Sequence, residues 1–218
     1  MSHKRTFVRN GGSMTEEDLT ISKGDRTRLT LIEVAYTLFV EQGYHGTSMR
    51  QIAEGAGLAL GGIYNHFANK EEIFKAVIFT YHPFIKVIPQ LTAVPTTSAE
   101  TMLREVIRLF DLEMQQDRGI FNLLFIELIE MKSKHVPEMA ELLMPSVLPF
   151  FQDLMAHSDQ LHVQDPLVIM RMLIGTLLSF YLTGQMMSGT VLDTESTRSI
   201  ETFITILLRG LTNDHATP

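Results

Sequence analysis

The most constraining feature of this sequence is the stretch from Thr47 to Lys70, TSMRQIAEGAGLALGGIYNHFANK. Ser48 is a good helix N-cap, and Gln51 three residues later completes a capping box. Apolar residues then recur at helical spacing until Gly57, which stands where a left-handed residue ends a helix at least cost. The spacing therefore predicts a first helix that stops in a tight turn at Gly57.

A second short helix is predicted over residues 59–67, with Ile63 and Phe67 four residues apart on its buried side. Asn69 is placed to cap a third helix, and Glu72 is placed to form a second capping box. Two short helices joined by a glycine turn form a helix-turn-helix, whose second helix enters the major groove of DNA.

These residues closely resemble the DNA-binding segment of the TetR family of bacterial transcriptional regulators. The resemblance covers residues 26–74. It implies a homodimer that binds a pseudo-palindromic DNA operator, acts as a repressor, and is released by a small, largely apolar or amphipathic effector. The matching positions are Thr47-Ser48, Ile52-Ala53, Ala56-Gly57, Gly61, Ile63-Tyr64, His66-Phe67 and Lys70-Glu71, preceded by Ala35, Leu38-Phe39 and Gly43-Tyr44.

The resemblance also places individual residues on the DNA. Asn65 would bond an adenine edge in bidentate fashion, worth ~1–3 kcal/mol of discrimination, while Tyr64 and His66 would donate to phosphate. Thr47 and Lys70 occupy the family's phosphate-contacting positions, where contacts fix register. The full predicted DNA-binding set is Thr47, Arg50, Leu60, Gly61, Tyr64, Asn65, His66 and Lys70.

The chain departs from the family just before Gly61. A small hydroxyl residue and often a basic residue stand there in the family, but this chain has Ala59 and Leu60, which lose an N-cap and a charge. Leu60 would instead touch a thymine methyl group. The structural alternatives are that Gly61-Gly62 forms only an irregular turn, that Tyr64 merely packs, and that Asn65 is a solvated surface residue.

Charge is divided unevenly along the chain. Residues 1–75 carry nine Lys and Arg against nine Asp and Glu, so the whole net charge of −7 belongs to residues 76–218. A neutral DNA-binding segment predicts modest electrostatic affinity per subunit and hence reliance on dimerisation. The chain has no cysteine, which suits a reducing cytoplasm, and residues 1–22 read as a flexible arm without an apolar signal core.

The remaining periodicity is helical, and period-2 alternation is not sustained anywhere. We therefore expect an all-α protein with a three-helix DNA-binding domain at residues 23–75 and a larger helical effector-binding and dimerisation domain at residues 76–218. Pro145 and Pro149 predict a kink or break in the fourth segment. Beyond a connecting helix at about 70–81, the predicted helical segments are 98–117, 119–134, 137–157, 165–188 and 195–211.

The last two helices are the predicted dimer interface. A charge-free run from Met172 to Leu192 is long enough to span a membrane, but its polar residues favour a helix buried in a core or dimer interface. In the family, the final two helices commonly pair across a two-fold axis into a four-helix bundle. The predicted interface combines a small-residue groove with an apolar stripe: Gly175, Ser179, Thr183, Phe203, Ile204, Leu207 and Leu208.

The second domain is the predicted effector sensor, because helical bundles bind ligands between their helices in largely apolar pockets. Most of the candidates also fit an ordinary core, since aromatic and methionine stripes usually pack there. Arg171 would meet a ligand carboxylate or pair with an acid of its own domain. The predicted lining residues are Phe110, Met114, Phe121, Phe125, Leu128, Met131, Met170, Arg171, Phe180 and Tyr181.

Enzymatic and metal-binding functions find no support in the sequence. There is no metalloprotease histidine motif, phosphate loop or paired-acid constellation, so we expect no catalytic residue, metal or cofactor. Two other functions remain open. One is a family relative whose N-terminal domain binds a protein partner instead of DNA, and the other is an α-helical enzyme that uses the second-domain cavity.

Overall fold

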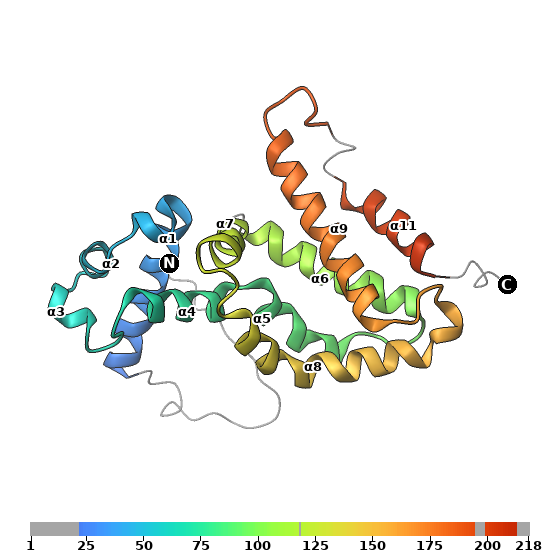
Figure 1. The fold of residues 1–218 in the computed structure, drawn as a ribbon, viewed down its shortest axis with the longest axis horizontal. Helices are drawn as coiled ribbons and strands as arrows, with labels where there is room; N and C mark the ends of the chain where they lie inside the picture. The colour runs from blue at the N-terminus through green and yellow to red at the C-terminus, as the bar shows by residue number, and fades with distance from the viewer. Residues whose placement is uncertain (1–21, 118, 195–198, 213–218) are drawn as a thin grey trace, which may run out of the picture.

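The computed structural model describes residues 22–117, 119–194 and 199–212, and every regular element within these ranges is helical, as predicted (Figure 1). The first elements are α1 Lys23–Gly46, α2 Met49–Gly55, α3 Leu60–Ile63, α4 Lys70–Tyr81, α5 Pro83–Val87 and η2 Ile88–Ala93. The later ones are α6 Ala99–Gln116, α7 Gly119–Phe125, η3 Ile126–Glu130, α8 Val136–Ala156, η4 Ser158–Gln160, α9 Pro166–Met187 and α11 Ile200–Leu211.

Helices α1 to α4 form a unit at one end of the molecule (Figure 1). Their amphipathic faces meet in one core, in which Phe39 of α1 packs edge-on against Phe74 of α4 with ring centroids 5.3 Å apart. Gly43 has φ +75° and interrupts α1 where the sequence predicts that helix to end. The main buried residues of this core are Leu31, Ile32, Ala35, Phe39, Ile52, Ala53, Ile63, Phe67, Ile73, Phe74, Val77 and Ile78.

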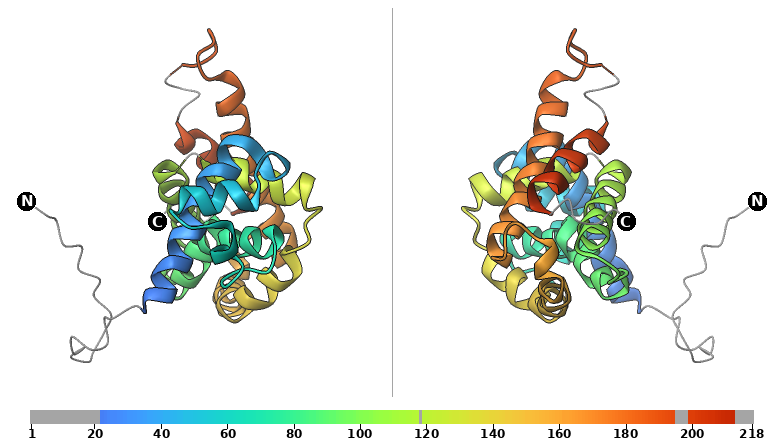
Figure 2. Two further views of the ribbon diagram at one scale, coloured as in Figure 1. Left: turned by 90° about the vertical axis from the view of Figure 1, so that its left-hand side faces the viewer. Right: turned by 90° about the vertical axis from the view of Figure 1, so that its right-hand side faces the viewer.

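A second core lies among α5, α6, α8, α9 and α11. Helix α6 contributes the most regular stripe, from Met102 and Leu103 to Phe110, and α9 and α11 pack beside it. The C-terminal end of α9 and the segment after it project beyond the rest of the molecule, as the two side views show (Figure 2). This projection leaves apolar side chains of α9 exposed, including Leu178 and Met186.

The two units are joined by more than the chain connection. Helix α4 runs without interruption past the predicted boundary at residues 75 and 76, and Val77 and Ile78 are buried in the first core. Leu123 of α7 and Ile126 of η3 are buried in the same core, although they belong to the second half of the chain. The predicted helix at 119–134 is regular only to Phe125, after which a π-type turn follows.

Helix α8 runs through Pro145 and Pro149 without a break, so the prediction of a break there is wrong. Each proline removes the hydrogen bond to the carbonyl four residues earlier, which leaves the carbonyls of Glu141 and Pro145 without that partner. All three of these residues are exposed, so water can satisfy the two carbonyls. The helix therefore tolerates both prolines on its solvent side.

Candidate nucleic-acid interface and ligand pocket

Local hydrogen bonds fix the first helix and the turn of the helix-turn-helix as predicted. The Ser48 hydroxyl accepts from the Gln51 backbone N–H at 3.2 Å, and the Gln51 side chain accepts from the Ser48 N–H at 2.9 Å. Gly57 has φ +70°, and the next N–H, of Leu58, donates to the Ala53 carbonyl at 2.8 Å. This turn sets the direction in which α3 leaves α2.

Helix α3 is shorter than the predicted range of residues 59–67. It covers Leu60–Ile63, and residues 64–66 continue it as hydrogen-bonded turns, in which the His66 N–H donates to the Ile63 carbonyl at 3.0 Å. Ala59 supplies no side-chain cap, and two glycines lower the helix propensity, which explains the shortening. Arg28 of α1 holds the far end, because its guanidinium donates to the His66 carbonyl at 3.0 Å and lies 4.0 Å from the Phe67 ring centroid.

Four of the residues predicted to face DNA form an exposed patch on α3 and its continuation. Leu60 is 44% exposed and Tyr64 is 52% exposed, and Gly61 and Asn65 are exposed as well. A Cβ built on Gly61 would meet nothing within 4 Å, so a partner can approach the backbone there. Within the described chain the Tyr64 and Asn65 side chains make no hydrogen bond, so their polar atoms face outward. Ile63 and Phe67 lie underneath, fully or almost fully buried.

The four other predicted contacts lie differently, and of these His66 is half-buried. Thr47 is only 2% exposed, and its hydroxyl donates to the Gly43 carbonyl at 2.9 Å. Lys70 is half-buried, and burial lowers the pKa of its ammonium while the Glu130 carboxylate opposes that change. Arg50 is exposed but forms an i,i+4 ion pair with Glu54 at 2.8 Å. In this conformation the polar groups of Thr47 and Lys70 are therefore used in contacts within the protein. Arg50 must give up its ion pair with Glu54 before it can bind a phosphate.

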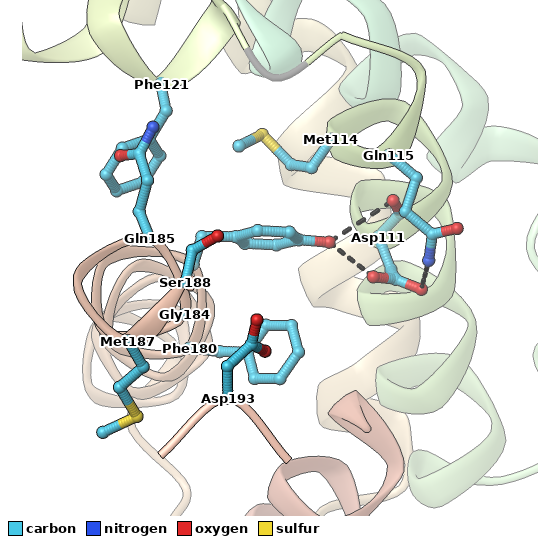
Figure 3. A pocket seen from close by; sticks show the side chains of 11 residues that line it. Asp111, Met114, Gln115, Phe121, Phe180, Gly184, Gln185, Met187, Ser188 and Asp193 are labelled. Carbon is cyan, nitrogen blue, oxygen red and sulfur yellow. Dashed lines mark hydrogen bonds between the residues drawn. The ribbon is translucent and has the colours of Figure 1, made fainter. Parts of the chain in front are cut away.

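A cavity of about 700 Å³ lies between α6, α7 and the C-terminal end of α9 (Figure 3). Tyr181 lines it, and its hydroxyl donates to the Asp111 carboxylate on α6. Burial, followed by this bond to a carboxylate, raises the pKa of the Tyr181 phenol, so the phenol stays protonated and remains a donor. The lining residues are Asp111, Met114, Gln115, Phe121, Phe180, Tyr181, Gly184, Gln185, Met187, Ser188 and Asp193.

A smaller cavity of about 60 Å³ adjoins the first, because Met114, Phe121 and Tyr181 line both. Its other lining residues are all apolar: Pro83, Phe84, Phe110, Leu124, Ile174, Leu177 and Leu178. The two together offer a polar compartment next to an apolar one, which is a common composition for a site that binds small organic molecules.

Half of the predicted ligand set reaches these cavities: Phe110, Met114, Phe121, Phe180 and Tyr181. The remaining five line neither. Phe125 packs against Phe121, Leu128 is 57% exposed, and Met131 packs on the first core. Met170 is half-buried, and Arg171 is exposed, not buried as its apolar surroundings suggest.

The polar lining was not predicted from the sequence. Asp111 lies three residues before Met114 and four before Gln115, so the helical period places it beside both on α6. Gln185, Ser188 and Asp193 belong to the end of α9 and the loop after it, where no periodic signal exists. Among the described residues, no three His, Asp or Glu side chains are grouped to hold a metal.

The predicted dimer residues divide into two groups. Ile204, Leu207 and Leu208 are at most 6% exposed and already pack in the second core of this single chain, and Phe203 packs beside Phe180. Gly175 and Ser179 are exposed on α9, and Thr183 is half-buried. Helix α9 is long and apolar enough to cross a membrane, and only 11% of its most apolar window is buried.

Polar contacts connect α1 of the first unit to the end of α6 and to α7. The Tyr36 hydroxyl of α1 donates to Asp117 at 2.5 Å, and Asn122 donates to the Val40 carbonyl at 3.3 Å. Further along, buried Glu127 accepts from the His135 backbone N–H at 2.8 Å and lies 2.8 Å from its ring Nδ1. Phe121 of the cavity lies on α7 itself, so the cavity wall and the Asn122 contact with α1 share one short helix.

Comparison with known proteins matches the sequence of the N-terminal unit. The family model described as bacterial regulatory proteins, tetR family, matches residues 31–77. The HTH-type transcriptional repressor KstR2 of Mycobacterium tuberculosis is 49% identical over 43 residues, which are 20% of this chain and 22% of that protein. The matched segment thus spans about a fifth of the length of this curated relative.

Solved structures match the fold over most of the chain. FadR from Bacillus subtilis in complex with stearoyl-CoA has a TM-score of 0.67 and 20% identity, covering 84% of this chain and 98% of that one. The SmeT–triclosan complex has a TM-score of 0.62 and 21% identity, covering 88% and 95%. The sequence of residues 31–77 thus matches the TetR family of bacterial regulatory proteins, and the described chain shares the fold of these solved structures.

Proposed function

We propose that this protein is a cytoplasmic, ligand-responsive transcriptional repressor that binds a pseudo-palindromic operator as a homodimer. The proposal rests chiefly on the exposed patch of α3, where Leu60, Tyr64 and Asn65 project outward from a helix whose buried side is anchored. A helix held in this way can enter a major groove and read base edges. KstR2, which matches part of this unit, is described as a repressor.

The proposed dimer forms through the outer faces of α9 and α11. Leu178 is 41% exposed, Met186 is 72% exposed and Ile206 is 68% exposed, so a single chain leaves these apolar side chains in water. A Cβ built on Gly175 would meet nothing within 4 Å, which leaves room for a partner helix to approach closely. A second copy of the same face would bury this surface by two-fold symmetry. We propose this occupant in preference to a lipid bilayer, because the transcriptional regulator FadR shares the fold.

The proposed effector is a small amphipathic molecule in the paired cavities. Their combined size suits a drug-sized compound. The neighbours of similar fold bind stearoyl-CoA and triclosan, which supports an effector with substantial apolar surface. No catalytic role is proposed for the cavity.

The proposed signal passes through α7. A ligand that displaces Phe121 moves the helix that also carries Asn122 and Leu123, and these contact α1 and the first core. Such a shift changes the separation of the two recognition helices in the dimer, and half-sites must match that separation within a turn of DNA. Release requires that the effector bind the non-DNA-binding arrangement more tightly than the DNA-binding one.

Selection from a random-sequence DNA pool by the purified protein tests the proposal and assumes no operator sequence. The expected product is an enriched sequence with two inverted half-sites whose centres lie about one helical turn, or a multiple of it, apart. Binding to that sequence should weaken steeply as salt rises, because phosphate contacts release counterions. Failure to enrich any sequence would contradict the proposal.

A protein partner for the N-terminal unit is the second candidate. The neutral charge of residues 1–75 and the exposed Leu60 favour it, because both suit an apolar contact better than a phosphate backbone. Under this alternative, DNA binding would be weak and equal for all sequences, and the Leu60→Ala variant would lose a protein contact in place of a DNA contact.

A further inference from the structure

The described lining of the larger cavity carries acidic side chains and no basic ones. Its charged lining residues are Asp111 and Asp193, and no lysine, arginine or histidine is among the described residues that line it. The smaller cavity has no charged residue in its described lining. A ligand that fills both therefore meets carboxylates at one end and hydrocarbon at the other.

Asp111 is held in place by neutral donors. One carboxylate oxygen accepts from the Tyr181 hydroxyl, and the other accepts from Gln115 Nε2 at 2.6 Å. Within the described chain Asp111 forms no ion pair. Two cations of α5 and α6 are used elsewhere, since Arg108 pairs with Glu105 and Lys86 pairs with Glu113. The Asp111 carboxylate thus lines the cavity, and no described side chain forms an ion pair with it.

Aromatic rings surround the same space. Phe180 and Tyr181 lie 5.1 Å apart, ring centroid to centroid, and Phe121 stands across the cavity on α7 (Figure 3). The faces of such rings attract a cation, and the attraction grows where water is excluded. Aromatic faces beside a fixed carboxylate favour a positively charged group and disfavour an anion.

We propose that the effector is a cationic amphiphile, with an ammonium or amidinium group beside Asp111 and its apolar part against Phe84 and Phe110. This inference rests on the proposed function and assigns the charge of its effector. The cavity of about 700 Å³ has room for the polar end and for part of an apolar body. A fatty carboxylate in the same place would bring its charge next to the Asp111 carboxylate.

Titration calorimetry with three probes of equal chain length tests the charge directly: decyltrimethylammonium, decanol and decanoate, each below its micelle concentration. The cation is expected to bind about tenfold or more tightly than the alcohol, since one desolvated charge contact is worth that much. Decanoate is expected to bind most weakly. Equal affinities, tighter binding of decanoate, or no binding of the cation would overturn the inference.

Asp111→Asn then tests the residue. The amide keeps an oxygen that can accept from Tyr181 but has no charge, so affinity for the cation should fall about tenfold while affinity for decanol changes less than about twofold. The matched control is Asp153→Asn, an exposed carboxylate of α8 that lines neither cavity and should change neither affinity. If Asp111→Asn does not fold, the three-probe titration of the parent protein decides. An unchanged preference for the cation in the folded cavity variant would overturn the inference.

The proposed function fails separately from this inference. If decanoate or decanol releases the protein from its selected operator but the cation does not, the proposed repressor function is supported and the proposed cationic effector is wrong. If no operator is selected, the repressor is wrong whatever the cavity binds.

Discussion

Lys70 donates from its Nζ to the backbone carbonyl of Thr47 at 2.7 Å, so two residues expected to contact DNA phosphates contact each other. The same ammonium donates to the Tyr44 carbonyl at 2.6 Å and lies 4.2 Å from the Tyr44 ring centroid. Lys70 thus ties the start of α4 to the junction of α1 and α2. Its effect on DNA binding is expected to come through the placement of the helix-turn-helix.

Replacing Lys70 tests this role. Lys70→Met keeps most of the apolar stem but removes both hydrogen bonds, and it should lower the free energy of unfolding by about 1–3 kcal/mol. Urea unfolding followed by circular dichroism measures the change. Arg50→Met is the control, because exposed Arg50 pairs only with Glu54 within the described chain and its loss should leave the urea midpoint unchanged. An unaltered midpoint for Lys70→Met would show that Lys70 is not a structural tie.

Gly119 tests the contact between the two units. A Cβ at this position would lie 2.8 Å from the Tyr36 hydroxyl and 2.9 Å from Val40 Cγ1, closer than any real contact. Gly119→Ala should therefore lower the free energy of unfolding by about 1–3 kcal/mol through overpacking. Gly184→Ala is the control, because its Cβ would meet nothing within 4 Å. Equal stability of the two variants would contradict the close packing of α7 on α1.

His82 predicts a loss of stability in acid. It is 4% exposed, and its Nδ1 accepts from the Phe84 N–H at 3.1 Å, which requires a neutral ring. Burial lowers the pKa of His82 to about 4, below the value of about 6.5 in an unfolded chain. As the pH falls, the unfolded state therefore binds a proton at this histidine before the folded state does. The free energy of unfolding is highest above pH 6.5 and falls by on the order of 3 kcal/mol as the pH drops toward 4.

The measurement is urea unfolding between pH 7.5 and 4.5. His82→Asn keeps a side-chain oxygen that caps α5 but does not titrate, so its stability should fall less steeply over this range than that of the parent protein. Identical slopes for the two proteins would show that His82 does not carry the acid sensitivity.

The dimer proposal predicts that charge on the outer face of α11 separates the subunits. Ile206 is 68% exposed in the single chain, so Ile206→Glu should fold and yet behave as a monomer in light scattering coupled to gel filtration. Leu142→Glu on α8 is the control, since Leu142 is 57% exposed and lies outside the proposed interface. A dimeric Ile206→Glu protein would place the interface elsewhere.

Local chemistry explains which parts of the fold were predictable. The Ser48–Gln51 capping box, the Asn69 cap, the Gly57 turn and the α4 boundary depend on residues within four positions of one another, and all of them are confirmed. The second capping box is only half formed, because the Glu72 carboxylate accepts from the Ala68 N–H and not from the Asn69 N–H. The length of α3 was overestimated because Ile63 and Phe67 have helical spacing, whereas Ala59 and the two glycines weaken the helix around them. The apolar spacing there favours a longer helix, the low helix propensity of the glycines favours a shorter one, and the shorter helix is the one observed.

The ligand site was predictable only in part, because a cavity depends on how distant helices meet. Helix α9 is apolar on nearly all sides, so periodicity could not tell that Arg171 faces water while Tyr181 faces the cavity. Asp111 and Asp193 belong to elements far apart in sequence, and only the packing of α9 on α6 brings them to one space. The charge of the cavity is therefore a property of the fold.

The central claim is that α3 reads DNA sequence, and the affinity of Tyr64→Ala and Asn65→Ala for the selected operator tests it most directly. Thr80→Ala, an exposed change at the other end of α4, is the matched control. Asn65→Ala should lose about 1–3 kcal/mol per subunit and relax preference at one base pair of each half-site. Tyr64→Ala should weaken binding without changing the preferred sequence, as loss of a phosphate contact does. If both variants bind the operator as tightly as Thr80→Ala does, α3 is not the recognition element and the account is contradicted.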